Sequence, residues 1–125
     1  MPLKVLVADD DTGIQNLISF VLEDEGIEVI LASNGQEGVE QFRNHPDIDF
    51  IITDYMMPIM NGLEMVQEIR RNSDMVPILF VSTEGGKATT AMAKNGGANA
   101  WLVKPFDPDT LLQMVSQVAA VKASG

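Results

Sequence analysis

The sequence contains no cysteine, and it has only one histidine, one tryptophan and one tyrosine among its 125 residues. The lack of cysteine excludes a disulfide framework and a thiolate metal site, and it fits a reducing compartment. Basic residues are also few: 8 Lys and Arg stand against 18 Asp and Glu, which gives a formal charge of −10. Because this charge repels phosphate backbones and anionic lipid, we expect a partner that is neither a nucleic acid nor a membrane.

Long hydrophobic runs are missing as well. No apolar stretch approaches the ~20 residues of a membrane span, and Asp9, Asp10 and Asp11 follow the first short apolar run directly, unlike a signal peptide. We therefore expect a soluble, cytoplasmic protein. The 46% apolar and 21% charged composition is that of a globular protein. The length suits one domain, so we expect residues 1–125 to form a single domain without an output domain.

Five short apolar runs are present instead, and they are typical of strands in a parallel sheet. They are continuous and do not alternate with polar residues, so we expect strands that are buried on both faces. The predicted strands are Leu3–Ala8, Glu28–Ala32, Phe50–Thr53, Ile78–Val81 and Ala100–Val103.

Segments with helical periodicity separate and follow these runs. The last helix begins clearly, with Asp107 as N-cap and Pro108 in the first position. The fourth helix is the weakest, because it carries Ala, Thr and Gly where the others carry Leu and Ile. Alternating strands and helices predict a (βα)5 chain, an α/β fold with a doubly wound, five-stranded parallel sheet covered on both faces. The first helix is predicted from the apolar stripe Ile14, Leu17, Ile18, Val21 and Leu22.

Acidic residues stand at the ends of two predicted strands. Asp9 and Asp10 follow the first strand, and Asp54 follows the third. Ligands bind at the carboxyl edge of such a sheet, and if the first and third strands are neighbours, the three carboxylates converge there. At about 5 Å apart they repel by about 3 kcal/mol per pair at an effective dielectric near 20, so the cluster needs a cation. Oxygen ligands without His or Cys favour Mg²⁺.

Hydroxyl and ammonium groups end the last two predicted strands. Ser82 and Thr83 follow the fourth strand, and Lys104 follows the fifth. The Lys104 charge, together with a divalent cation, balances three carboxylates. Carboxylate, divalent ion, lysine and hydroxyl are the parts that a phosphoryl-transfer site requires.

These motifs resemble those of the receiver (response-regulator) family, and the whole chain is closest in shape to stand-alone chemotaxis regulators of the CheY type. The resemblance implies the flavodoxin-like strand order 2-1-3-4-5. It rests on Val-Ala-Asp9-Asp10-Asp11, Asp54-Tyr-Met-Met-Pro58, Asn61-Gly62, Pro77-Ile-Leu-Phe-Val-Ser82 and Lys104-Pro105-Phe106.

The resemblance also implies a role for each site residue. Asp54 would accept the phosphoryl group. Asp10, Asp54 and the Met56 backbone carbonyl would bind Mg²⁺ directly, and Asp9 would act mostly through water. Ser82 and Lys104 would each contact a phosphoryl oxygen, and the Lys104-Pro105 peptide bond would be cis.

Other positions would adjust the rate or transmit the signal. Met56 and Glu84 occupy the two positions that tune dephosphorylation in the family, and Thr83 stands where the family mostly has Ala or Gly, so it narrows access to Asp54. Trp101 would move inward when Ser82 is drawn to the phosphoryl group. Plain structural roles compete with some of these: Met56, Met57, Met60 and Met65 are typical of core and loop filling, and Asp11 is typical of an N-cap.

The family resemblance predicts a two-component response regulator, a monomer that is phosphorylated by a sensor histidine kinase. It would control a downstream protein through the surface of its fourth helix, fifth strand and fifth helix, with chemotaxis as a candidate process. It would not be an enzyme beyond its own phosphorylation and dephosphorylation. A phosphate sink or phosphorelay intermediate is an open alternative.

An alternative from another class is a haloacid-dehalogenase-type phosphatase. Asp9-Asp10-Asp11-Thr12 satisfies the motif of those enzymes and would make Asp9 the nucleophile. Those enzymes carry a cap and a second acidic pair after the lysine, whereas here only Asp107-Pro-Asp109 follows and is explained as a helix cap. The phosphatase interpretation also leaves the motif from Asp54 to Gly62 unexplained.

Overall fold

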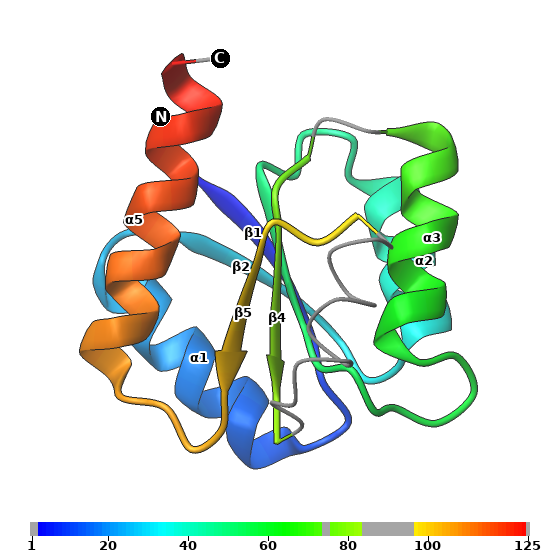
Figure 1. Ribbon diagram of the computed structural model, residues 1–125, viewed down its shortest axis with the longest axis horizontal. Coiled ribbons are helices and arrows are strands. Elements are labelled where there is room, and N and C mark those ends of the chain that lie inside the picture. Colours follow the sequence, from blue (N-terminus) through cyan, green and yellow to red (C-terminus); the bar gives the residue numbers. More distant parts are fainter. Residues whose placement is uncertain (1–2, 74–75, 84–96, 125) are drawn as a thin grey trace.

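The computed structural model describes residues 3–73, 76–83 and 97–124. Five parallel strands form one sheet in the order β2-β1-β3-β4-β5, which confirms the predicted fold class and strand order (Figure 1). The predicted strand bounds are confirmed to within one residue. The strands are β1 (Lys4–Ala8), β2 (Glu28–Ala32), β3 (Phe50–Thr53), β4 (Ile78–Ser82) and β5 (Ala100–Val103).

Helices cover both faces of the sheet, with α1 and α5 on one side and α2 and α3 on the other (Figure 1). The predicted fourth helix lies in residues 84–96, outside the described part of the chain. No helix in the described ranges is long and apolar enough to cross a membrane. The described helices are α1 (Thr12–Asp24), α2 (Gly35–Asn44), α3 (Gly62–Asn72) and α5 (Pro108–Ser124).

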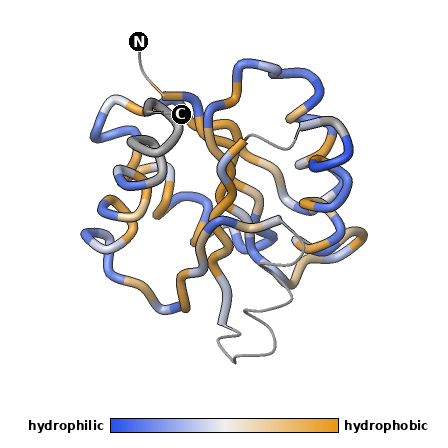
Figure 2. The backbone as a smooth tube through the Cα atoms, turned by 45° about the horizontal axis from the view of Figure 1, so that its top comes forward, coloured by the Kyte–Doolittle hydropathy of each residue, from blue (hydrophilic) through white to orange (hydrophobic). Residues whose placement is uncertain are grey.

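Each side of the sheet has its own core. Alternate residues of the central strands contribute to opposite sides, so Leu6 packs towards α2 and α3 while Val5 and Val7 pack towards α1 and α5. Figure 2 shows hydrophobic residues along the strands in the interior and hydrophilic residues on the outer turns of the helices. This double coverage explains the continuous apolar sequence of β1, β3 and β4, which are almost entirely buried.

The expectation that all five strands are buried on both faces is wrong for β2 and β5. Both lie at the edges of the sheet and are largely half-exposed or exposed. Leu31 of β2 is 38% exposed, and Val103 of β5 is 46% exposed. An edge strand has a neighbour on one side only, and a continuous apolar run does not reveal this position.

The helix starts agree with the residues that precede them. The Asp11 carboxylate accepts hydrogen bonds from the Gly13 and Ile14 amides, so its predicted N-cap role is confirmed. Asp107 caps α5, since its carboxylate accepts a hydrogen bond from the Asp109 amide at 3.0 Å. Asn61 and Glu64 form a capping box at the start of α3.

The apolar stripe predicted for α1 is partly wrong. Leu17 is 38% exposed, whereas Gln15, which the stripe omits, is buried. Gln15 is stabilised there because its side-chain amide donates hydrogen bonds to the backbone carbonyls of Asp9 and Ala32. The buried face of α1 therefore includes one satisfied polar side chain.

Candidate functional site

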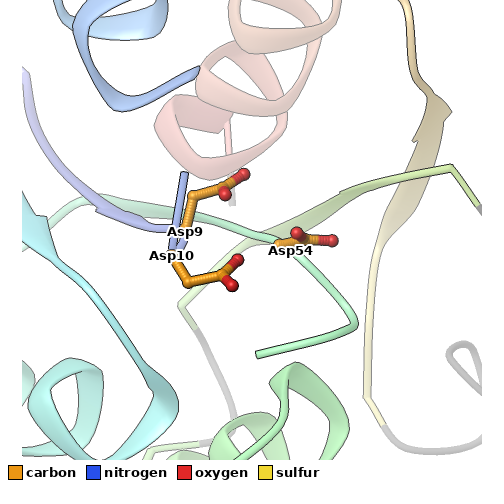
Figure 3. A group of neighbouring side chains, drawn as sticks. All are labelled: Asp9, Asp10 and Asp54. Carbon is orange, nitrogen blue, oxygen red and sulfur yellow. The ribbon is translucent and has the colours of Figure 1, made fainter. Parts of the chain in front are cut away.

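The acidic residues are brought together by the pairing of β1 with β3. Ala8 lies opposite Thr53 in this register, and the Asp54 amide donates to the Ala8 carbonyl at 2.9 Å. Asp9 and Asp10 leave β1 at the same edge of the sheet where Asp54 leaves β3. The three side chains consequently lie next to one another (Figure 3).

The three carboxylates form a compact cluster. One oxygen atom from each of Asp9, Asp10 and Asp54 lies within 4.8 Å of the others. Asp9 is 2% exposed and Asp54 is 8% exposed, while Asp10 is exposed to solvent. The cluster thus combines two carboxylates in the protein interior with one at the surface.

Lys104 supplies a positive charge to the two buried carboxylates. Its Nζ atom lies 2.8 Å from an Asp9 oxygen and 3.2 Å from an Asp54 oxygen. Among the residues that the structure describes, no basic side chain forms an ion pair with Asp10. The three carboxylates and Lys104 therefore leave an excess of negative charge, most of it open to solvent at Asp10.

The pKa values of Asp54 and Lys104 reflect this arrangement. Burial and the neighbouring Asp9 charge raise the pKa of Asp54 above its ordinary value, although the Lys104 charge opposes the shift. Burial alone would lower the pKa of Lys104, but its hydrogen bond to Asp9 and the charge of Asp54 outweigh burial and raise it. Lys104 is thus held in its charged form between two acids.

The backbone around Asp54 is closely fitted to the start of α3. The Asp54 carbonyl accepts a hydrogen bond from the Thr53 hydroxyl at 2.9 Å. A Cβ atom added to Gly62 would stand 2.0 Å from the same carbonyl oxygen, so only glycine fits there without displacing the backbone. Gly62 was predicted only as part of a motif, and its close approach to Asp54 is a finding of the structure.

The cluster fits a small divalent cation. Its ligand atoms are all carboxylate oxygens, which Mg²⁺ prefers. The Asp10 carboxylate is exposed, so a hydrated ion can reach it from solvent. The acidic residues could therefore hold a metal ion. Met56 lies in the loop that follows Asp54, and its backbone amide donates a hydrogen bond to the Asp54 carboxylate at 3.4 Å.

The remaining predicted site residues lie at the same edge of the sheet or behind it. Ser82 is fully buried at the end of β4, and its carbonyl accepts a hydrogen bond from the Lys104 amide at 2.8 Å. Thr83 is exposed directly after it, and Glu84 lies outside the described residues. Met56 lies in a loop and is 58% exposed, so it does not fill the core, whereas Met65 is fully buried in the core.

Trp101 packs among aromatic rings. Its ring stacks on Phe80 with a centroid distance of 5.3 Å, and Tyr55 lies 6.0 Å from both rings. The indole Nε1 atom is buried, and the described residues offer it no hydrogen-bond partner. Tyr55 directly follows Asp54 in the chain, so the aromatic group connects Trp101 with the acidic cluster. The predicted cis peptide bond between Lys104 and Pro105 is confirmed.

Known proteins resemble this chain over most of its length. The family model described as "Response regulator receiver domain" matches residues 5–116. Chemotaxis protein CheY1 of Helicobacter pylori is 38% identical over 119 residues, which cover 93% of this chain and 96% of that protein.

Two solved structures show the same fold. Chemotaxis protein CheY4 of Vibrio cholerae is 38% identical with a TM-score of 0.90, over 94% of this chain and 99% of that one. CheY of Borrelia burgdorferi, crystallised in a complex with CheX, BeF3 and Mg²⁺, is 29% identical with a TM-score of 0.91, over 94% and 90% of the two chains. Because the family model matches most of the chain and a relative is 38% identical to it, the chain belongs to the response-regulator receiver family.

Proposed function

We propose that this protein is a two-component response regulator that receives a phosphoryl group on Asp54 from a sensor histidine kinase. The observation that carries the proposal is the arrangement of Asp54 between Asp9, Asp10 and Lys104 at the carboxyl edge of the sheet. In the proposed reaction an Asp54 oxygen forms a bond to phosphorus while the bond from phosphorus to the histidine nitrogen breaks. The electron pair of the broken bond stays on the imidazole, which then takes a proton from solvent.

Asp9, Asp10, Asp54 and the Met56 carbonyl are the residues that we propose to hold Mg²⁺. Bound there, the ion would neutralise charge on the acceptor and on the phosphoryl oxygens. Asp9 is also fixed by two hydrogen bonds, from the Asp11 amide at 2.9 Å and from Lys104 at 2.8 Å. Asp9 is also less exposed than Asp54, at 2% against 8%, so we propose a positioning role for Asp9 and the acceptor role for Asp54.

Lys104 and Ser82 have proposed roles at the phosphorylated site. Lys104 already contacts an Asp54 oxygen at 3.2 Å, so it is positioned to pair with a phosphoryl oxygen when Asp54 is phosphorylated. Ser82 ends the strand next to β3 and would donate its hydroxyl to another phosphoryl oxygen.

Three neighbours would set the lifetime of the phosphorylated state. The exposed Met56 side chain offers no hydrogen bond to orient an attacking water, a role that we propose for Glu84. The branched Thr83 side chain would narrow the approach to Asp54. Thr83→Ala should therefore accelerate both phosphorylation by acetyl phosphate and hydrolysis, and unchanged rates would contradict this role.

The signal would leave through contact with a downstream protein, and chemotaxis is the process that the relatives' names suggest. We propose the surface that includes β5 and α5 as the output surface, with Trp101 as the residue that senses Ser82. The binding of CheX by the Borrelia relative supports a protein partner.

Incubation with acetyl phosphate tests the proposed acceptor. The wild-type protein should gain one phosphoryl group in intact-mass measurements when Mg²⁺ is present, and EDTA should suppress the gain. Asp54→Asn should abolish it. Phosphorylation that persists in Asp54→Asn would contradict the assignment.

A further inference from the structure

Ile59, in the loop between β3 and α3, has an unusual backbone conformation. Its φ angle is +70°, and no other non-glycine residue in the described part of the chain has a positive φ. A β-branched side chain is disfavoured there because its Cβ atom crowds the following carbonyl oxygen. The Ile59 side chain is also 76% exposed. The protein thus carries both backbone strain and an exposed apolar surface at one residue.

Contacts within the described residues do not compensate for these two costs. From this loop, Met57 and Met60 pack against the core on the α2 and α3 side, but Ile59 and the 58% exposed Met56 do not. Met56 and Ile59 are therefore two apolar side chains that this loop presents to solvent. Strain and exposure that the folded chain does not repay point to a function in binding.

The loop is held close to Asp54 at both of its ends. The Met56 amide contacts the Asp54 carboxylate at 3.4 Å, and the Gly62 amide donates to the Tyr55 carbonyl at 2.8 Å. Gly62 itself lies against the Asp54 carbonyl. Because Ile59 precedes Gly62 by three residues, their Cα atoms are at most about 11 Å apart. Met56 therefore contacts the acceptor, and Ile59 lies within about 11 Å of a residue that borders it.

We propose that Met56 and Ile59 form a docking contact for the protein that carries the phosphohistidine, so that they select protein donors over small ones. This inference rests on the proposed acceptor role of Asp54. A specific protein interface covers about 800 Å² on each partner, a disc of about 16 Å radius. A protein whose phosphohistidine reaches Asp54 therefore extends over Ile59, whereas acetyl phosphate enters without touching it.

Substitutions of Ile59 separate docking from chemistry. Ile59→Asn removes the apolar surface and tolerates a positive φ, so it should raise the melting temperature by about 3–6 °C. It should also lower the second-order rate constant of phosphotransfer from a phosphorylated histidine kinase that serves the wild-type protein, by about tenfold. The rate with acetyl phosphate should stay unchanged. Ile59→Val, which keeps the branched apolar side chain, is the matched control and should behave as wild type in all three measurements.

The outcomes distinguish this inference from the proposed function. Unchanged kinase transfer in Ile59→Asn overturns the docking contact, and so does an equal loss with both donors, because the loop would then shape the acceptor itself. Kinase transfer that is lost in Phe20→Ser but kept in Ile59→Asn places docking on α1, where Phe20 is 74% exposed, and also overturns it. If wild type takes no phosphoryl group from acetyl phosphate, the proposed acceptor role fails instead.

Discussion

Removing the Asp10 charge should stabilise the metal-free protein and remove its response to Mg²⁺. Asp10 lies within 4.8 Å of Asp9 and Asp54, and Lys104 forms ion pairs with those two but not with Asp10. Asp10→Asn keeps the size of the side chain and removes the charge, so both repulsions disappear. The substitution also removes the attraction between Asp10 and the nearby Lys104 charge. The loss of this attraction offsets the gain from about one of the two removed repulsions.

The magnitude follows from the distances and from the exposure of Asp10. At 4.8 Å, two unit charges interact by about 1 kcal/mol in water and by about 3.5 kcal/mol at an effective dielectric of 20. Asp10 is exposed, so the value near the water limit applies to it. We expect the free energy of unfolding in EDTA to rise by about 1–2 kcal/mol. Mg²⁺ at ten times its dissociation constant should add about 1.4 kcal/mol to wild type and nothing to Asp10→Asn.

Urea denaturation with and without Mg²⁺ measures both effects. Asp11→Asn is the matched control, because it removes a neighbouring charge while asparagine still caps α1. It should change the free energy of unfolding little and keep the Mg²⁺ response. If Asp10→Asn leaves the metal-free stability unchanged, the repulsion argument is refuted. If it is stabilised by Mg²⁺ as wild type is, the ion binds elsewhere.

Three further predictions concern other parts of the structure. Gly62→Ala should lower the free energy of unfolding, measured in urea, by about 2–3 kcal/mol, because the new Cβ atom would meet the Asp54 carbonyl oxygen at 2.0 Å. Gly13→Ala is the control, since its Cβ atom would meet the Asp11 carboxylate at 3.1 Å; an equal loss in both variants would contradict the clash. Trp101 fluorescence should change on addition of beryllofluoride and Mg²⁺, less so in Ser82→Ala, whereas identical spectra would exclude Trp101 from the switch. The Asp47 pKa should lie below 3.8 by NMR titration because of its hydrogen bond to Lys4, so its contribution to stability is present above pH 3.8 and is lost as the pH falls through the lowered pKa. Lys4→Met should raise the Asp47 pKa towards its ordinary value, and no difference between the two proteins would exclude the ion pair.

The central strands could be predicted from sequence because burial on both faces requires continuous apolar residues. The same pattern misled for β2 and β5, since the composition of a run does not show whether the strand has one neighbour or two. Strand order came from the family resemblance and not from the pattern. The predicted apolar stripe of α1 omits Gln15. This residue can be buried because its side-chain amide donates to two backbone carbonyls, which only the folded chain brings within reach.

The candidate site was predictable in its members but not in its contacts. The positions of the acidic residues at strand ends and the motif around Asp54 were sufficient to predict that these residues cluster, provided that β1 and β3 are neighbours. The distances from Lys104 to Asp9 and Asp54 join residues 95 and 50 positions apart, so they depend on the whole sheet. The positive φ of Ile59 had no local signal, because a turn after Pro58 would ordinarily place Gly or Asn at such an angle.

The central claim is that Asp54 itself carries the phosphoryl group. The most direct measurement treats the protein with acetyl phosphate and Mg²⁺, reduces the acyl phosphate with borohydride and locates the resulting homoserine by tandem mass spectrometry. We expect homoserine at position 54 and unmodified aspartate at positions 9 and 10. Homoserine at position 9, with Asp54 unmodified, would contradict it.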